Sequence, residues 1–142
     1  FPRPLIGSND VDFSFSGLKT AVLREVIKLK EKNNNKLTQE DVQDVCACLQ
    51  KTIIDVLIFK TLKAAKKYKV KSILLGGGVS ANQKLRNDFA LEIENSKLKI
   101  ELFVPSKSLC TDNAAMIAAA AFFNHKELPW KKITANPELY FD

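Results

Sequence analysis

The sequence has little of several residues and patterns that mark particular classes of protein. Its 142 residues include five Gly, five Pro, three Cys and one His. Gly and Pro are too few for a collagen-like or low-complexity chain. The longest apolar run, Ala114 to Phe123, falls short of the roughly 20 residues that a membrane-spanning helix needs. Three Cys without a C-x-x-C pair favour reduced thiols in the cytosol over a disulfide framework.

The sequence also lacks an initiating Met. The chain begins Phe1-Pro2-Arg3-Pro4, and its single Met is Met116. We therefore expect a piece of a longer protein. Within it, 46% hydrophobic and 27% charged residues suit one globular core, so residues 1–142 are expected to form a single domain. The net charge of +6 is compatible with nucleic-acid binding without requiring it.

What the sequence does contain is an alternation of helical and strand patterns. Thr38 and Asp41 form a variant of the capping box, and no Gly or Pro follows before Val70, so one helix of about 30 residues is expected there. The other expected elements are a strand over 12–15, a helix between Ser16 and the Asn run 33–35, strands over 71–75 and 99–104, a helix over 81–94, and an Ala-rich helix beginning at Thr111 or Asp112. This order predicts an α/β fold with a right-handed β-loop-α-β crossover over 73–104.

The run Gly76-Gly77-Gly78 lies between an expected strand and an expected helix. Glycine lets the backbone approach a ligand closely, and the next helix presents free N–H groups. The run completes neither of the two common phosphate-binding glycine motifs, so a tight turn without a ligand stays open. Asn82 follows the run. Its amide can both donate and accept, as recognition of a ribose or base edge requires, but it can equally cap the helix.

Asp112 precedes the last expected helix. A carboxylate there is a good helix cap and complements the helix dipole. It could instead be a metal ligand, but a single carboxylate cannot hold a transition metal without partners, which are usually His. The only histidine, His125, lies about 20 Å further along a continuous helix. If Asp112 binds a metal, its partner ligands lie outside this chain.

Six lysines crowd the end of the long expected helix: Lys60, Lys63, Lys66, Lys67, Lys69 and Lys71. They could be a solvated face that keeps the protein soluble. They could also contact the phosphates of a nucleic acid, and such binding would weaken with salt. Only Tyr68 is interleaved with them, so a base-stacking platform is not expected.

Four stretches together resemble the C-terminal part of the TsaD/Gcp family, the tRNA N6-adenosine threonylcarbamoyltransferases that were formerly labelled O-sialoglycoprotein endopeptidases. They occur in the family's order and with matching gaps. The stretches are 1–4 (FPRP), 12–20 (DFSFSGLKT), 76–86 (GGGVSANQKLR) and 110–118 (CTDNAAMIA). The last is similar to the bacterial and organellar form of the family.

The resemblance implies part of an actin/Hsp70/sugar-kinase-like (ASKHA) fold of two lobes around a nucleotide cleft. It implies transfer of a threonylcarbamoyl group from threonylcarbamoyl-AMP to N6 of adenosine 37 in tRNAs that read codons beginning with A. By the same resemblance, Gly77, Gly78 and Asn82 bind the adenylate, and Asp112 binds one divalent ion, iron or zinc. The implied partners are tRNA, a paralogous subunit and an ATPase, with no membrane. The implied location is cytoplasmic, or organellar in a eukaryote.

The sequence departs from the family in one large respect. The family's His-x-x-x-His pattern, which supplies two metal ligands from the N-terminal lobe, is absent here. No catalytic residue is assigned to this piece, and we expect it to be inactive when isolated. Two other readings stay open: a lobe that only binds nucleotide or partner proteins, and a metallo-endopeptidase as in the old family label. Cys110 has no histidine within reach by sequence, which weighs against the peptidase.

Overall fold

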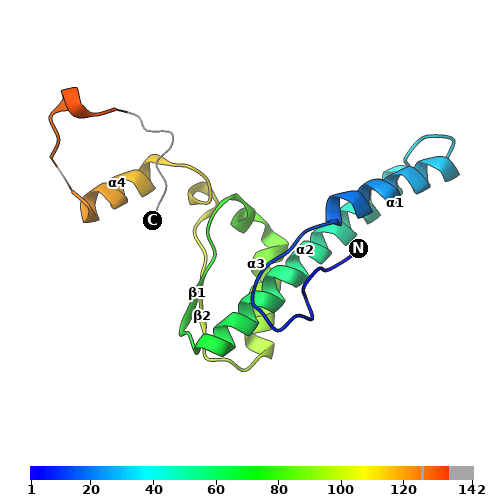
Figure 1. Ribbon diagram of the computed structural model, residues 1–142, viewed down its shortest axis with the longest axis horizontal. Coiled ribbons are helices and arrows are strands. Elements are labelled where there is room, and N and C mark those ends of the chain that lie inside the picture. Colours follow the sequence, from blue (N-terminus) through cyan, green and yellow to red (C-terminus); the bar gives the residue numbers. More distant parts are fainter. Residues whose placement is uncertain (126, 135–142) are drawn as a thin grey trace.

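The computed structural model describes residues 1–125 and 127–134, and Figure 1 shows the arrangement of its elements. The helices are α1 (Leu18–Lys32), α2 (Gln39–Tyr68), α3 (Gln83–Asn95) and α4 (Ala114–Phe123). The strands are β1 (Ser72–Leu74) and β2 (Glu101–Phe103). Short 3-10 helices cover Gly78–Ala81, Lys107–Leu109 and Trp130–Lys132. The predicted mixture of helices with a parallel sheet is confirmed.

The longest element is α2, whose 30 residues match the expected length. The predicted capping box is present at its start. The Asp41 backbone N–H donates to the Thr38 hydroxyl at 3.0 Å, and the Thr38 backbone N–H donates to the Asp41 carboxylate at 2.9 Å. The Asn33 side chain donates to the same carboxylate at 2.9 Å, which ties the end of α1 to the start of α2. These hydrogen bonds lower the pKa of Asp41, with the backbone donor at Thr38 contributing most.

One face of α2 carries the main hydrophobic core. The strands β1 and β2 pair in parallel, with Ile73 opposite Leu102, and α3 connects them as the predicted crossover. Burying apolar surface between α2, α3 and the sheet is the main stabilising contribution to such a layer. The buried core residues are Ile54, Ile58, Ala65, Ile73, Leu85, Phe89 and Ile93.

The opposite face of α2 is also buried. Thr52, Val56 and Lys60 are almost fully shielded from solvent, and each lies two positions, or about 200°, from a core residue. Residues 1–16 run along this side of the helix (Figure 1). The Lys60 ammonium donates to the Ser8 hydroxyl at 2.7 Å and to the Asp10 carboxylate at 2.9 Å. Hence α2 organises both halves of the chain.

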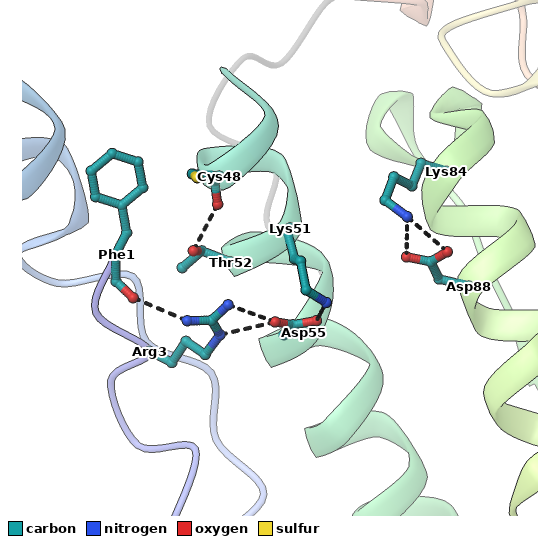
Figure 2. A network of polar contacts seen from close by, with 8 residues as sticks. All are labelled: Phe1, Arg3, Cys48, Lys51, Thr52, Asp55, Lys84 and Asp88. Carbon is teal, nitrogen blue, oxygen red and sulfur yellow. Dashed lines mark hydrogen bonds and ion pairs between the residues drawn. The ribbon is translucent and has the colours of Figure 1, made fainter. Parts of the chain in front are cut away.

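A second polar contact fastens the N-terminal segment to α2. The Arg3 guanidinium donates to one Asp55 carboxylate oxygen at 2.7 and 3.0 Å, and Lys51 donates to the other at 3.1 Å (Figure 2). Partial burial opposes ionisation of Asp55, but the bonds from Arg3 and Lys51 outweigh it and lower its pKa. Arg3 also donates to the Phe1 carbonyl at 3.1 Å, which holds the first turn of the segment in place.

The lysine cluster is therefore not one surface. Lys60 is fully buried, so neither the solvated face nor the nucleic-acid contact considered for it is correct. Its side chain lies between α2 and the N-terminal segment, where the ammonium group donates hydrogen bonds to Ser8 and Asp10. Lys63 donates to the Ser8 carbonyl. Lys66, Lys67, Lys69 and Lys71 remain exposed.

Two sequence predictions near the N-terminus are wrong. A strand needs a neighbouring strand for its backbone hydrogen bonds, and residues 12–15 pair with none among residues 1–125 and 127–134, so they form no strand. Phe13 and Phe15 are 49% and 40% exposed. The cap of α1 is Gly17, not Ser16. Gly17 adopts a φ of 76°, in the left-handed region that glycine favours, and no side chain caps this helix.

The helix α4 stands apart from the other helices in Figure 1. All ten of its residues are exposed, including Phe122 at 80% and Phe123 at 81%, although none of them is charged. An apolar helix with no covering surface is unusual in a folded domain. Across residues 1–125 and 127–134, no helix has both the length and the apolar character needed to cross a bilayer.

Acid is expected to loosen the N-terminal segment. Hydrogen bonds from Lys60 and then Ser8 lower the pKa of Asp10 from 3.8 to about 2. At a pH above the ordinary pKa of Asp, ionised Asp10 therefore stabilises the fold, and this contribution is lost as the pH falls from about 4 to about 2. Asp10→Asn should reduce the pH dependence of the unfolding free energy in that range, as measured by urea denaturation.

The matched control is Asp44→Asn, which changes an exposed carboxylate on α2. It should leave the pH dependence as it is in the unmodified protein. Identical pH profiles for both variants would contradict the role given to the contact between Asp10 and Lys60.

Candidate functional site

The glycine run forms the loop between β1 and α3. Gly77 has φ 79° and ψ 172°, a conformation that strains any residue with a side chain. The buried Ser80 closes the loop, since its backbone N–H and its hydroxyl both donate to the Gly77 carbonyl, at 3.0 and 2.7 Å. Among the described residues, no atom lies within 4 Å of where a side chain would begin at Gly76 or Gly77. The loop therefore presents open backbone to its surroundings.

Asn82 caps α3. Its side-chain oxygen accepts the Leu85 backbone N–H at 3.0 Å, so the capping reading is correct. The cap does not use the whole amide, because the side-chain nitrogen donates to the Gln50 side-chain oxygen at 2.8 Å. Asn82 and Gln50 both line an open pocket of about 270 Å³ between α2 and the start of α3. The other lining residues are Cys46, Leu49, Ile53, Ile54, Leu57, Val79 and Leu85.

Asp112 does not cap α4. Asn113 takes that role, because its side-chain oxygen accepts the Met116 backbone N–H at 2.9 Å, so the helix begins later than expected. Asn and Asp are about equally good N-caps, so the helix can begin one residue later with Asn113 as its cap. The Asp112 side chain is exposed and makes no hydrogen bond or ion pair with the described part of the chain. Its carboxylate remains available to a ligand.

The structure places the segment around Asp112 beside the glycine loop. A methyl group added to Gly78 would lie 3.8 Å from the Thr111 side-chain methyl, which is ordinary van der Waals contact. Three of the predicted site residues, Gly77, Gly78 and Asn82, thus share one loop and helix start, and Asp112 follows the residue that touches this loop. The family resemblance already implied that these residues lie around one cleft, and the structure adds that Thr111 lies beside Gly78.

Arg86 ends the stretch 76–86 that resembles the family, but no role was predicted for it. From α3 it donates to the Ser80 carbonyl at 2.5 Å, to the Pro105 carbonyl at 2.9 Å and to the Cys110 thiol at 3.1 Å. One guanidinium therefore joins the glycine loop to both ends of the segment that leads to Asp112. A signal existed in the sequence, since Arg86 follows Asn82 by four residues and lies on the same side of a helix.

The described residues do not form a metal site by themselves. No group of three or more His, Cys, Asp or Glu side chains comes together within residues 1–125 and 127–134. His125 lies beyond the end of α4, where its ring is 3.8 Å from the Glu127 carboxylate. The exposed Asp112 carboxylate fits as one oxygen ligand, and any further ligands must come from elsewhere.

A larger cavity, of about 870 Å³, lies between the N-terminal segment, α2 and α3 and contains none of the predicted site residues. Three of its cationic side chains are paired with two of its carboxylates. Arg3 and Lys51 contact Asp55, and Lys84 contacts Asp88 at 3.0 Å (Figure 2). Because none of the predicted site residues lines this cavity, we place the candidate site at the glycine loop.

Comparison with known proteins gives a consistent result. The family model described as TsaD, tRNA N6-adenosine threonylcarbamoyltransferase, matches residues 1–119. The protein of that name from Desulfotalea psychrophila is 45% identical over 140 residues, which cover 99% of this chain and 39% of the relative. The one from Halalkalibacterium halodurans is 48% identical over 127 residues, covering 89% of this chain and 35% of the relative. The chain thus spans about two-fifths of the length of the curated relatives it matches.

Removing the Arg86 guanidinium is expected to loosen the segment that carries Asp112. Arg86→Gln leaves at least one partly buried acceptor without its donor, which should lower the unfolding free energy by about 1–3 kcal/mol. Amide hydrogen exchange over residues 105–113 should also become faster. Lys84→Ala is the control on the same helix, because Lys84 makes only an exposed pair with Asp88, and it should change stability by less than about 0.5 kcal/mol. Equal exchange rates in the two variants would contradict the bridging role.

Proposed function

Because the chain belongs to the tRNA N6-adenosine threonylcarbamoyltransferase family, we propose that the complete protein makes the threonylcarbamoyl modification of tRNA. The donor is threonylcarbamoyl-AMP, and the acceptor is N6 of adenosine 37 in tRNAs that read codons beginning with A. The observation that carries the proposal is the family match over a chain in which the glycine loop lies beside the segment leading to Asp112.

In this proposal the adenylate lies against the glycine loop. The open backbone at Gly77 lets the nucleoside come close without meeting a side chain, and Gly78, beside the Thr111 methyl group, has no side chain of its own to block the approach. Asn82 offers a ligand the amide hydrogen and the oxygen lone pair that remain after its bonds to Gln50 and Leu85. These residues bind and orient the donor substrate.

Asp112 is proposed as one ligand of a divalent ion, iron or zinc, with two His ligands from the part of the family protein outside this chain. Its exposed carboxylate, free of described contacts and next to the glycine loop, supports that role. When bound, such an ion supplies Lewis-acid polarisation and a template for the reacting group. Cys110 and Arg86 hold the residues before Asp112, and thereby limit where the carboxylate can reach.

The proposed reaction forms a C–N bond to the adenosine amine and breaks the C–O bond to AMP, and the amine loses a proton. An exocyclic amine of a base is a weak nucleophile, so alignment of the two substrates has to supply much of the rate. This chain contributes that alignment from the donor side only. We therefore propose that it is inactive by itself and works within a two-lobed protein of the actin/Hsp70/sugar-kinase-like kind.

The exposed α4 supports the proposal of further covering structure. More than half of each relative's length lies outside the match, and an apolar helix of small residues can pack closely on another surface. The same exposure favours the second reading, an interaction lobe that docks on the paralogous subunit or the ATPase. For tRNA, Lys66 and Lys67 are the exposed basic residues on α2 that fit a phosphate contact.

Two substitutions in the complete protein separate the proposed roles. Asn82→Asp keeps a good helix cap but replaces the amide donor by an acceptor, so it should weaken AMP binding about tenfold or more and leave metal content unchanged. Asp112→Ala should lower the metal content after dialysis and leave AMP binding nearly unchanged. Both should reduce tRNA modification, measured by release of the modified nucleoside after digestion.

Matched controls use residues of the same type away from the site. Asn87→Asp changes an exposed Asn on α3, and Asp44→Ala changes an exposed Asp on α2. Neither should alter binding or modification. Full modification activity in the Asp112→Ala protein would contradict the metal role, and unaltered AMP binding in the Asn82→Asp protein would contradict the adenylate role.

A further inference from the structure

The Asn82 amide is held at both of its ends. The Leu85 backbone N–H can only donate, so the atom that it meets must be the Asn82 oxygen. The Asn82 nitrogen therefore faces α2, where it donates to the Gln50 side-chain oxygen at 2.8 Å. The Leu85 N–H therefore determines the positions of the oxygen and nitrogen in the Asn82 amide. The Asn82 nitrogen in turn determines that the Gln50 oxygen, and not its nitrogen, faces Asn82.

The cap alone does not fix the plane of the Asn82 amide. A single hydrogen bond to the oxygen leaves the group free to swing about that contact, and the nitrogen would then sweep across the pocket. The bond to Gln50 supplies a second point and removes this freedom. Both residues are half-buried and line the pocket of about 270 Å³ with mainly apolar neighbours, among them Leu49, Ile53 and Val79. In apolar surroundings a hydrogen bond orients its partners more strongly than in water.

We propose that Gln50 is a positioning residue for substrate binding: from α2, it fixes the orientation in which Asn82 presents its remaining hydrogen and lone pair to the adenylate. This inference rests on the proposed function, since it assumes that Asn82 binds the donor substrate. It adds that α2, which carries the core of the domain, also sets the geometry of the site. The Gln50 side chain need not touch the substrate to act in this way.

The test compares two replacements of nearly equal size in the complete protein. Gln50→Met keeps the length and packing but removes the acceptor, whereas Gln50→Glu keeps an acceptor for the Asn82 nitrogen. Gln50→Met should weaken AMP binding about fivefold to tenfold and raise the KM for threonylcarbamoyl-AMP similarly, with kcat changed less. Gln50→Glu should retain AMP affinity within about twofold of the unmodified protein. Gln43→Met, at an exposed position on the same helix, should have no effect.

A double replacement separates positioning from packing. If Gln50 acts through Asn82, then Gln50→Met should weaken AMP binding little further in a protein that already carries Asn82→Ala. A loss of equal size in both backgrounds would overturn the inference and assign Gln50 a packing role. So would AMP binding by Gln50→Met that matches the unmodified protein.

The two levels of the account fail differently. If Asn82→Ala weakens AMP binding but Gln50→Met does not, only the inference about Gln50 is wrong. If Asn82→Ala itself binds AMP as tightly as the unmodified protein, the proposed adenylate site is wrong, and the role of Gln50 falls with it.

Discussion

The structure depends on the burial of α2 on two opposite faces. Ile54 and Ile58 face α3 and the parallel strands, while Val56 and Lys60 face the N-terminal segment. A helix with only one buried stripe could have organised one of these layers but not both. The same helix carries Gln50 to the pocket beside Asn82. The site is therefore built on the most firmly held element, as precise placement of a ligand requires.

The proposed site is one side of a larger binding surface in our proposal. Its two segments follow the carboxyl ends of β1 and β2, where open α/β layers hold their ligands. Arg86 ties these segments together, so the distance between the glycine loop and the residues before Asp112 is set within this domain. What the described residues do not supply is a complete group of metal ligands or a cover for α4. Both deficits agree with a chain that spans about two-fifths of its relatives.

The sequence predicted an element well where the signal for it lies within a few neighbouring residues. The capping box at Thr38 and the absence of Gly and Pro fixed α2 almost to its ends, and the alternation of elements gave the crossover. The failures concern contacts with distant residues. Residues 12–15 alternate like a strand but pair with no strand among the described residues. Lysine is usually a surface residue, but Lys60 is buried and donates to Ser8 and Asp10, about 50 positions away. The role of Gln50 could not be predicted, because it depends on a contact across elements. The spacing of Arg86 from Asn82 was a local signal, but it did not reveal the hydrogen bonds to Pro105 and Cys110.

The central claim is that the glycine loop and the segment around Asp112 form one face of a single site. Hydrogen exchange of the complete protein, with AMP and a divalent metal added separately and together, tests it most directly. We expect AMP to slow exchange over residues 77–85 and metal to slow it over residues 110–113. The two together should protect both segments more than either alone. Protection confined to regions outside these two segments would contradict the account.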